Sequence, residues 1–149
     1  MITPFTDEYF MKKALQEAKI AFNKGEVPVG AVVVLKDQII ARAHNLTETL
    51  NDVTAHAEMQ AFTAAADFLG GKYLKDCTLY VTLEPCQMCA GASYWSQISK
   101  IVYGASELER GFENLNTKLH PKTTVISGIL QEECSTVLKR FFMEKRKLT

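Results

Sequence analysis

Three residues have side chains and spacings suited to holding a metal ion. Cys86 and Cys89 are three positions apart, so at the start of a helix both thiols would lie on one face and could share an ion. The positive end of the helix dipole would also favour the thiolate form. His56 offers a third ligand from an earlier segment. A His-Cys-Cys set suits Zn²⁺, one ion per chain, and leaves the fourth tetrahedral position to water, as catalytic zinc sites require.

Glu58 stands two residues after His56. On an ideal helix these side chains would point to different faces, so Glu58 is not predicted to be an ordinary ligand. In the first turn of a helix, however, its carboxylate could still reach a water molecule held by the metal. Two thiolates and a neutral imidazole cancel the charge of zinc, which leaves that water less acidic and makes a carboxylate base useful. The alternative is a solvated glutamate favoured near a helix N-terminus.

The two segments together match a known pattern. Residues 56–58 (His-Ala-Glu) and 85–89 (Pro-Cys-Gln-Met-Cys) have the H-x-E and P-C-x-x-C spacing of zinc-dependent nucleobase deaminases, in which the glutamate moves protons. A C-x-x-C pair alone also occurs in redox proteins and in structural zinc modules without enzymatic activity. Cys77 and Cys134 could complete a closed four-ligand site, but each lies in a pattern where a buried thiol is common. The paired motifs therefore favour a zinc deaminase with Glu58 as its catalytic residue.

The elements that must position these residues alternate along the chain. Thr6 is a suitable N-cap and Gly25 a stop for the first helix, and Pro85 suits the first turn of the third. The alternation favours an α/β fold, a five-stranded mixed sheet with helices on both faces. The predicted elements are a helix over residues 7–24, strands over 30–35 and 38–43, a helix over about 54–69, a strand over 78–83, a helix over 85–96, strands over 100–103 and 123–127, and a helix over 132–147.

The composition limits the classes of protein to consider. Seventeen Lys and Arg against 17 Asp and Glu leave no overall charge that would mark a nucleic-acid or membrane-surface binder. The length and the 47% hydrophobic content fit one domain over residues 1–149. No apolar run is long enough to span a bilayer, and the N-terminus lacks the pattern of a secretion signal. Four cysteines without such a signal indicate free thiols in a cytoplasmic protein.

Three longer stretches, residues 25–33, 54–59 and 79–86, resemble the bacterial tRNA-specific adenosine deaminase family. The resemblance implies a cytidine deaminase-like three-layer α/β/α fold and a homodimer. It also implies hydrolytic conversion of adenosine to inosine at the wobble position of a tRNA anticodon stem-loop. In this family's pattern Asn45 would hydrogen-bond the base and the Ala57 backbone would help to hold it. By itself Asn45 is typical of a turn.

The C-terminal segment interleaves basic and aromatic residues. Phe141, Phe142 and Arg146 are the predicted RNA contacts, because such a segment could bind phosphates and stack on a loop nucleotide. A similar Phe-Phe ending in the family favours this interpretation. The alternative is an amphipathic helix with a solvated basic face.

Other features leave a second enzymatic interpretation open. Residues 94–95 (Tyr-Trp) are similar to bacterial guanine deaminases, which share the zinc motifs and act on a free base. A free-base guanine or cytosine deaminase is therefore the alternative. Residues 106–122 form an irregular stretch long enough to be functional. His44 has no predicted role, and His120 is expected to be solvated.

Overall fold

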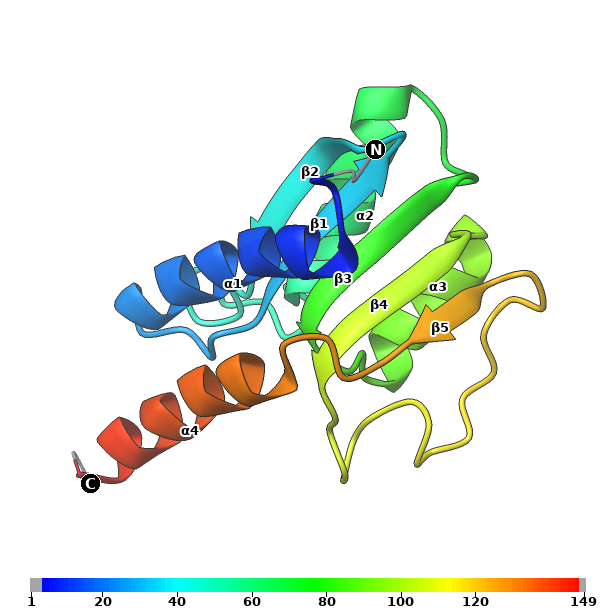
Figure 1. Cartoon of the computed structure of the whole chain (residues 1–149). Helices are drawn as coiled ribbons and strands as arrows, with labels where there is room; N and C mark the ends of the chain where they lie inside the picture. The colour runs from blue at the N-terminus through cyan, green and yellow to red at the C-terminus, as the bar shows by residue number, and fades with distance from the viewer. Residues whose placement is uncertain (1–3, 148–149) are drawn as a thin grey trace.

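The computed structural model describes residues 4–147, in which one sheet separates two pairs of helices (Figure 1). Helices α1 and α4 cover one face of the sheet, and α2 and α3 cover the other. The predicted α/β fold and the order of its elements are confirmed. The elements are α1 (Asp7–Asn23), β1 (Gly30–Leu35), β2 (Gln38–His44), α2 (Ala57–Leu69), β3 (Cys77–Leu83), α3 (Gln87–Ser96), β4 (Lys100–Ala105), β5 (Thr124–Ile126) and α4 (Gln131–Lys147).

The sheet is mixed, as predicted. Within the described residues its five strands follow the order β2-β1-β3-β4-β5. β1 is antiparallel to β2 and β3, whereas β4 is parallel to both β3 and β5. Lys36 and Asp37, between β1 and β2, have positive φ values of 50° and 61°. This pair of conformations is that of a type I′ hairpin turn, whose twist suits two antiparallel strands.

The central strands are buried on both faces. Ala31 and Val33 of β1 belong to the apolar cluster under α2 and α3. Val32 and Val34 belong to the cluster under α1, because successive side chains of a strand point to opposite faces. Cys77 and Cys134 are fully buried in these two clusters, as expected of core thiols. No helix among residues 4–147 is long and apolar enough to cross a membrane.

Two helices begin later than their sequence patterns predict. α2 begins at Ala57 rather than near residue 54, because Asp52 accepts hydrogen bonds from the N–H and hydroxyl of Thr54 at 2.8 and 2.7 Å. This local turn competes with the helix for the same backbone groups. α3 begins at Gln87, so Pro85 lies outside the helix and not in its first turn. Consequently, His56 and Cys86 are N-cap residues with extended backbones.

Gly30 lies where the sheet passes closest to α1. A side-chain carbon at this position would collide with the Ala14 carbonyl oxygen and the Ala18 amide nitrogen. The N–H of Gly30 donates to the hydroxyl of Thr82 in β3 at 3.1 Å. Gly30 therefore sets how closely α1 packs on the start of β1.

Gly30→Ala is expected to lower the free energy of unfolding by about 1–3 kcal/mol, because α1 must move away from the sheet. Gly71→Ala is the matched control, since residue 71 faces open space, and its effect should stay below about 0.5 kcal/mol. Urea unfolding of both variants measures the two changes. Equal losses of stability would contradict the close packing of α1 on Gly30.

Candidate active site

The predicted metal ligands come together where two helices begin. His56 is the N-cap of α2, Cys86 is the N-cap of α3, and Cys89 lies in the first turn of α3. The two helices pack against each other on the same face of the sheet. One ligand atom from each of the three residues lies within 4.8 Å of the others. No other such group of three or more His, Cys, Asp or Glu residues occurs in the described part of the chain.

The spacing of the donor atoms fits zinc. The Nδ1 atom of His56 lies 3.6 Å from the sulfur of Cys86 and 3.6 Å from the sulfur of Cys89. Ordinary Zn–S and Zn–N bond lengths at a tetrahedral angle give a nitrogen–sulfur separation of about 3.6 Å. Cys77 and Cys134 are not part of the cluster. The residues present therefore form a three-ligand set, as predicted, rather than a closed four-ligand site.

Hydrogen bonds within the cluster shift the pKa values of its three side chains. A hydrogen bond from Cys89, together with the neighbouring His56, lowers the pKa of the Cys86 thiol to about 4. The hydrogen bond with Cys86 and burial raise the pKa of the Cys89 thiol. The hydrogen bond with Cys86 also raises the pKa of His56. The cluster thus favours the thiolate form of Cys86, and a thiolate is a donor that a soft divalent ion prefers.

Glu58 is a buried residue beside the ligand cluster and not a solvated helix residue. Its side chain is 4% exposed, and burial raises the pKa of its carboxyl to about 7, since removal from water disfavours the charged form. On an ideal helix His56 and Glu58 would point to different faces, but His56 precedes the helix. His56 has ψ near 156° as the N-cap, so helical spacing does not apply to it and both side chains border one cavity.

A pocket of about 490 Å³ connects the ligands to the surface. Its lining includes His56, Glu58 and Cys86, together with the predicted base-binding residues Asn45 and Ala57. The Asn45 side chain has only long hydrogen bonds, from Nδ2 to the Val27 carbonyl and from the Thr47 N–H to Oδ1, both 3.4 Å. A hollow of about 820 Å³ between α1 and α4 is larger but contains neither histidine nor cysteine. The chemistry therefore belongs to the smaller pocket.

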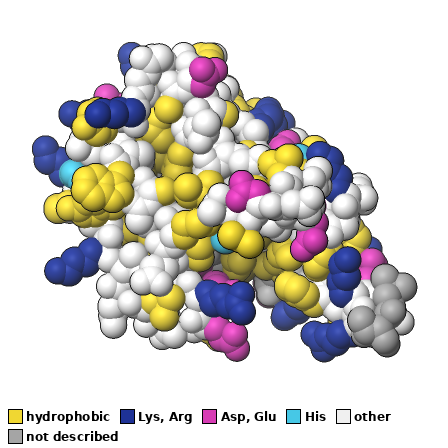
Figure 2. Space-filling model, turned by 180° about the vertical axis from the view of Figure 1, so that it is seen from behind, with side chains coloured by type: hydrophobic (Ala, Val, Ile, Leu, Met, Phe, Trp, Pro, Cys, Tyr) yellow, Lys and Arg dark blue, Asp and Glu magenta, His cyan; other side chains and the backbone are white. Residues whose placement is uncertain are grey.

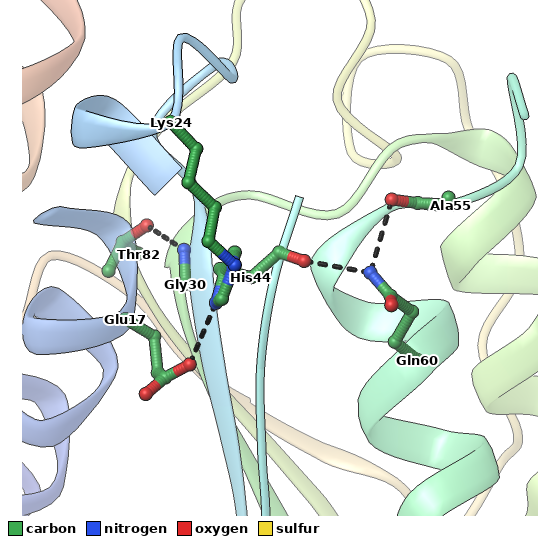
Figure 3. A network of polar contacts seen from close by, with 7 residues as sticks. All are labelled: Glu17, Lys24, Gly30, His44, Ala55, Gln60 and Thr82. Atoms are coloured by element: carbon green, nitrogen blue, oxygen red, sulfur yellow. Dashed lines mark hydrogen bonds and ion pairs between the residues drawn. The ribbon is translucent and has the colours of Figure 1, made fainter. Parts of the chain in front are cut away.

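His44, which ends β2 directly before Asn45, is held on both sides, as Figure 3 shows. Lys24 donates to Nε2 of His44 at 3.0 Å. Because an ammonium can only donate, the His44 proton lies on Nδ1, which donates to Glu17 at 2.9 Å. On the opposite side the His44 carbonyl accepts from Gln60 of α2 at 2.7 Å. His44, which had no predicted role, thus ties β2 to α1 and α2 next to Asn45.

A buried glutamate that the sequence analysis missed holds the loop after Asn45. The Glu26 carboxylate accepts the N–H of Glu48 at 3.0 Å, and the N–H and hydroxyl of Thr49 at 2.7 and 2.6 Å. Burial opposes ionisation of Glu26, but the hydrogen bonds from Thr49 and Glu48 outweigh it and lower its pKa. No local sequence pattern distinguishes a buried glutamate such as Glu26 from a solvated glutamate. The sequence therefore gave no sign of this role.

The opposite wall comes from the irregular stretch predicted to be functional. Ser106, Glu107 and Arg110 line the pocket, although the sequence analysis named none of them. His120 lies in the same stretch, where its Nδ1 accepts the Lys122 N–H at 3.2 Å and its ring packs 5.8 Å from Tyr94. It is therefore partly buried rather than simply solvated.

The structure separates the two neighbouring phenylalanines of α4. Phe141 is 7% exposed and packs against Phe22, with ring centroids 5.9 Å apart. The prediction that Phe141 contacts RNA is thus corrected, because its ring is part of the protein interior. Phe142 is 44% exposed and lines the pocket, and Arg146 follows one helical turn later.

Comparisons with known proteins agree with this geometry. Residues 4–105 match the family model described as the cytidine and deoxycytidylate deaminase zinc-binding region. The tRNA-specific adenosine deaminase of Bacillus subtilis (strain 168) is 49% identical over 147 residues, covering 95% of this chain and 91% of that protein.

Two solved structures are similar in fold and sequence. One, from a study of A-to-I editing by tRNA:A34 deaminases, has a TM-score of 0.82 and 42% identity, and the match covers 87% of this chain and 99% of that one. Guanine deaminase from Bacillus subtilis has a TM-score of 0.65 and 43% identity over 68% of this chain and 65% of that one. With its ligand set and three-layer fold, this chain belongs to the zinc-binding cytidine and deoxycytidylate deaminase family.

Proposed function

We propose that the protein is a tRNA-specific adenosine deaminase that hydrolyses adenosine to inosine at the wobble position of an anticodon stem-loop. The observation that carries this proposal is a buried glutamate beside a three-ligand zinc set at the base of a pocket. Similarity over 95% of the chain to a protein named for this activity supports the substrate. A looped-out nucleotide suits such a pocket, because a base in a single-stranded loop is turned out at little cost.

Zinc held by His56, Cys86 and Cys89 would supply Lewis acidity, which lowers the pKa of a water molecule in the position that the three ligands leave free. Glu58 accepts a proton from the water that attacks C6 of adenine and donates it to ring nitrogen N1. The proton of the new C6 hydroxyl then passes to the amino group as the C6–N bond breaks, so adenosine and water become inosine and ammonia. Burial of Glu58 keeps this proton transfer away from bulk solvent.

Asn45 and Ala57 are proposed to hold the base. The Asn45 amide makes only long contacts with the protein, so it can turn its donor and acceptor to the base edge. Ala57 is the first residue of α2, where the backbone N–H has no acceptor within the helix. Both residues line the pocket that contains Glu58.

The end of α4 is proposed to contact the RNA beyond the target base. Phe142 is exposed at the pocket and can stack on a neighbouring nucleotide. Arg146 lies in the last turn of α4 with Lys145 and Lys147. Figure 2 shows Lys and Arg side chains gathered at the lower right, where α4 ends. This local charge would bind phosphates although the whole chain is neutral.

A homodimer in the cytoplasm, with one deaminase domain per chain, completes the proposal. Figure 2 shows hydrophobic side chains gathered on the face that α2 and α3 cover. Val53, Phe68 and Trp95 are 85%, 58% and 77% exposed, and exposed apolar surface of this kind favours association. Sedimentation equilibrium measures the mass in solution directly.

A free-base guanine deaminase is the second candidate. The similarity to Bacillus subtilis guanine deaminase supports it, because that protein is 43% identical over 68% of this chain. Tyr94 and Trp95, noted for their likeness to this group, point the same way. The tRNA-specific adenosine deaminase ranks first, because the Bacillus subtilis protein of that name matches 95% of this chain.

Glu58→Gln should keep its zinc but lose about 10²–10⁴-fold in deamination rate, because the amide cannot accept and return the proton. His56→Ala should instead lose the metal, since only two ligands remain. Zinc content and single-turnover rates of both variants measure the contrast. Asp67→Asn, which removes an exposed charge from the same helix, serves as the control. A zinc-loaded Glu58→Gln protein with the rate of the wild type would exclude the proton-transfer role.

The wild-type protein should convert adenosine to inosine in an anticodon stem-loop and release no ammonia from guanine or cytosine. Inosine reads as guanosine when the RNA is sequenced after incubation. The same stem-loop with its only loop adenosine moved one position from the wobble site is the control, and it should remain unmodified. Ammonia from free guanine with unmodified RNA would replace the proposed function by the second candidate.

Replacing Lys145, Arg146 and Lys147 together by glutamine should weaken binding of the stem-loop and lower the slope of log K against log salt by about two, because three phosphate contacts are lost. Lys36, Lys72 and Lys75, which are also exposed, provide a triple variant of equal charge change. Fluorescence anisotropy over a range of salt concentrations measures both slopes. Equal slopes for the two triple variants would contradict the predicted RNA contact.

A further inference from the structure

A second buried glutamate stands directly before the metal-ligand turn. Glu84 is 5% exposed and is separated from Cys86 by one residue. Its Oε1 accepts the N–H of Glu107 and its Oε2 accepts the N–H of Glu113, each at 3.0 Å. Hydrogen bonds from two backbone amides replace the water that a buried carboxylate has lost. Glu84 thus contacts both ends of the segment 107–113.

Backbone contacts also tie this part of the chain to Cys86 and to the two residues before it. The Glu84 N–H donates to the Ala105 carbonyl at 2.8 Å, and the Phe112 N–H donates to the Pro85 carbonyl at 3.0 Å. Cys86 and Gly111 form an isolated antiparallel bridge. Residues 107–113 are therefore positioned by the turn at residues 84–86 as well as by β4, which precedes them.

The segment that Glu84 holds forms a wall of the pocket. Ser106, Glu107 and Arg110 face the cavity that contains Glu58. Glu107 in turn accepts the backbone N–H groups of Glu109 and Arg110 at 3.0 and 3.4 Å. The chain of contacts from Glu84 thus reaches the exposed Arg110 at the wall.

Gly111 gives independent evidence for how closely the loop approaches. A side-chain carbon at residue 111 would collide with the carboxylate of Glu84 and the carbonyl of Glu107. The φ of Gly111 lies outside the left-handed region that favours glycine. A glycine is therefore needed here only because a larger side chain would not fit. The absence of a side chain here lets the loop reach both carboxylate oxygens.

We propose that Glu84 is a positioning residue, which fixes the 106–113 wall relative to Cys86 and thereby sets the affinity of the pocket for its nucleotide. The inference rests on the proposed function, because the wall is assigned to substrate binding. Glu84 also lines the pocket, but both of its carboxylate oxygens accept backbone N–H groups, so its role is to position the loop and not to transfer protons. Glu26 makes a similar arrangement with Glu48 and Thr49 on the other side, so each wall has its own buried carboxylate.

Glu84→Gln tests the proposal, because a glutamine keeps one acceptor but turns an NH₂ group toward the second amide. The Glu107 and Glu113 amides should exchange hydrogen at least about tenfold faster. KM for the anticodon stem-loop should rise roughly tenfold while kcat changes less than about threefold, as for an interaction that binds substrate and transition state equally. Zinc content should stay at the wild-type value. Glu8→Gln, which makes the same change at an exposed residue of α1 outside the wall, should change none of these quantities.

Gly111→Ala tests the same contact from the loop and leaves Glu84 intact, so it decides the matter if Glu84→Gln does not fold. It should reproduce the faster exchange and the higher KM, and the double variant should be no worse than the more affected single variant. Unchanged exchange of both amides, or faster exchange with unchanged KM, would overturn the proposal. A wild-type protein without activity on RNA would overturn the proposed function instead, and the exchange measurements would still decide whether Glu84 holds the loop.

Discussion

The convergence of two helix N-termini is the constraint on which the rest of the structure depends. His56 and Cys86 occupy N-cap positions, and neither side chain caps its helix. A missing cap costs about 1 kcal/mol of stability at each helix. In return, the extended backbone of the N-cap directs both side chains out of the helix and toward one point. The uncapped first-turn amides also leave partial positive charge beside a thiolate and the Glu58 carboxyl, which stabilises negative charge in a buried place.

The sheet makes this convergence rigid. β3 is buried on both faces and leads directly into the turn that carries Cys86. α2 packs on β1 and β2, and His44 connects the end of β2 to α1 through Glu17 and to α2 through Gln60. Small errors in ligand position would disrupt tetrahedral coordination. The ligands therefore come from elements fixed by the core, and the irregular segments surround them.

Chemistry and substrate selection lie in different parts of the chain. The ligand set and Glu58 would suit several nucleobases, because deamination needs only an activated water and a proton carrier. The walls of the pocket come from the loop after Asn45, the stretch near Arg110 and the end of α4. Neighbouring residues of α4 have different roles, since Phe141 packs into the interior and Phe142 faces the pocket. This arrangement explains how one fold can serve both RNA and free-base deaminases.

The sequence by itself determined the metal ligands, the order of the elements and the core thiols, because each leaves a local pattern in residue type and spacing. Periodicity likewise predicted α1 and the β1–β2 hairpin to within a residue or two. Only the tertiary structure decided which helix residues are N-caps, that Glu58 is buried, and which of Phe141 and Phe142 is accessible. It alone revealed Glu26 and Glu84, whose roles depend on amides more than twenty residues away. Contacts between distant segments produce no regular spacing in the sequence, because these contacts form only when the chain has folded.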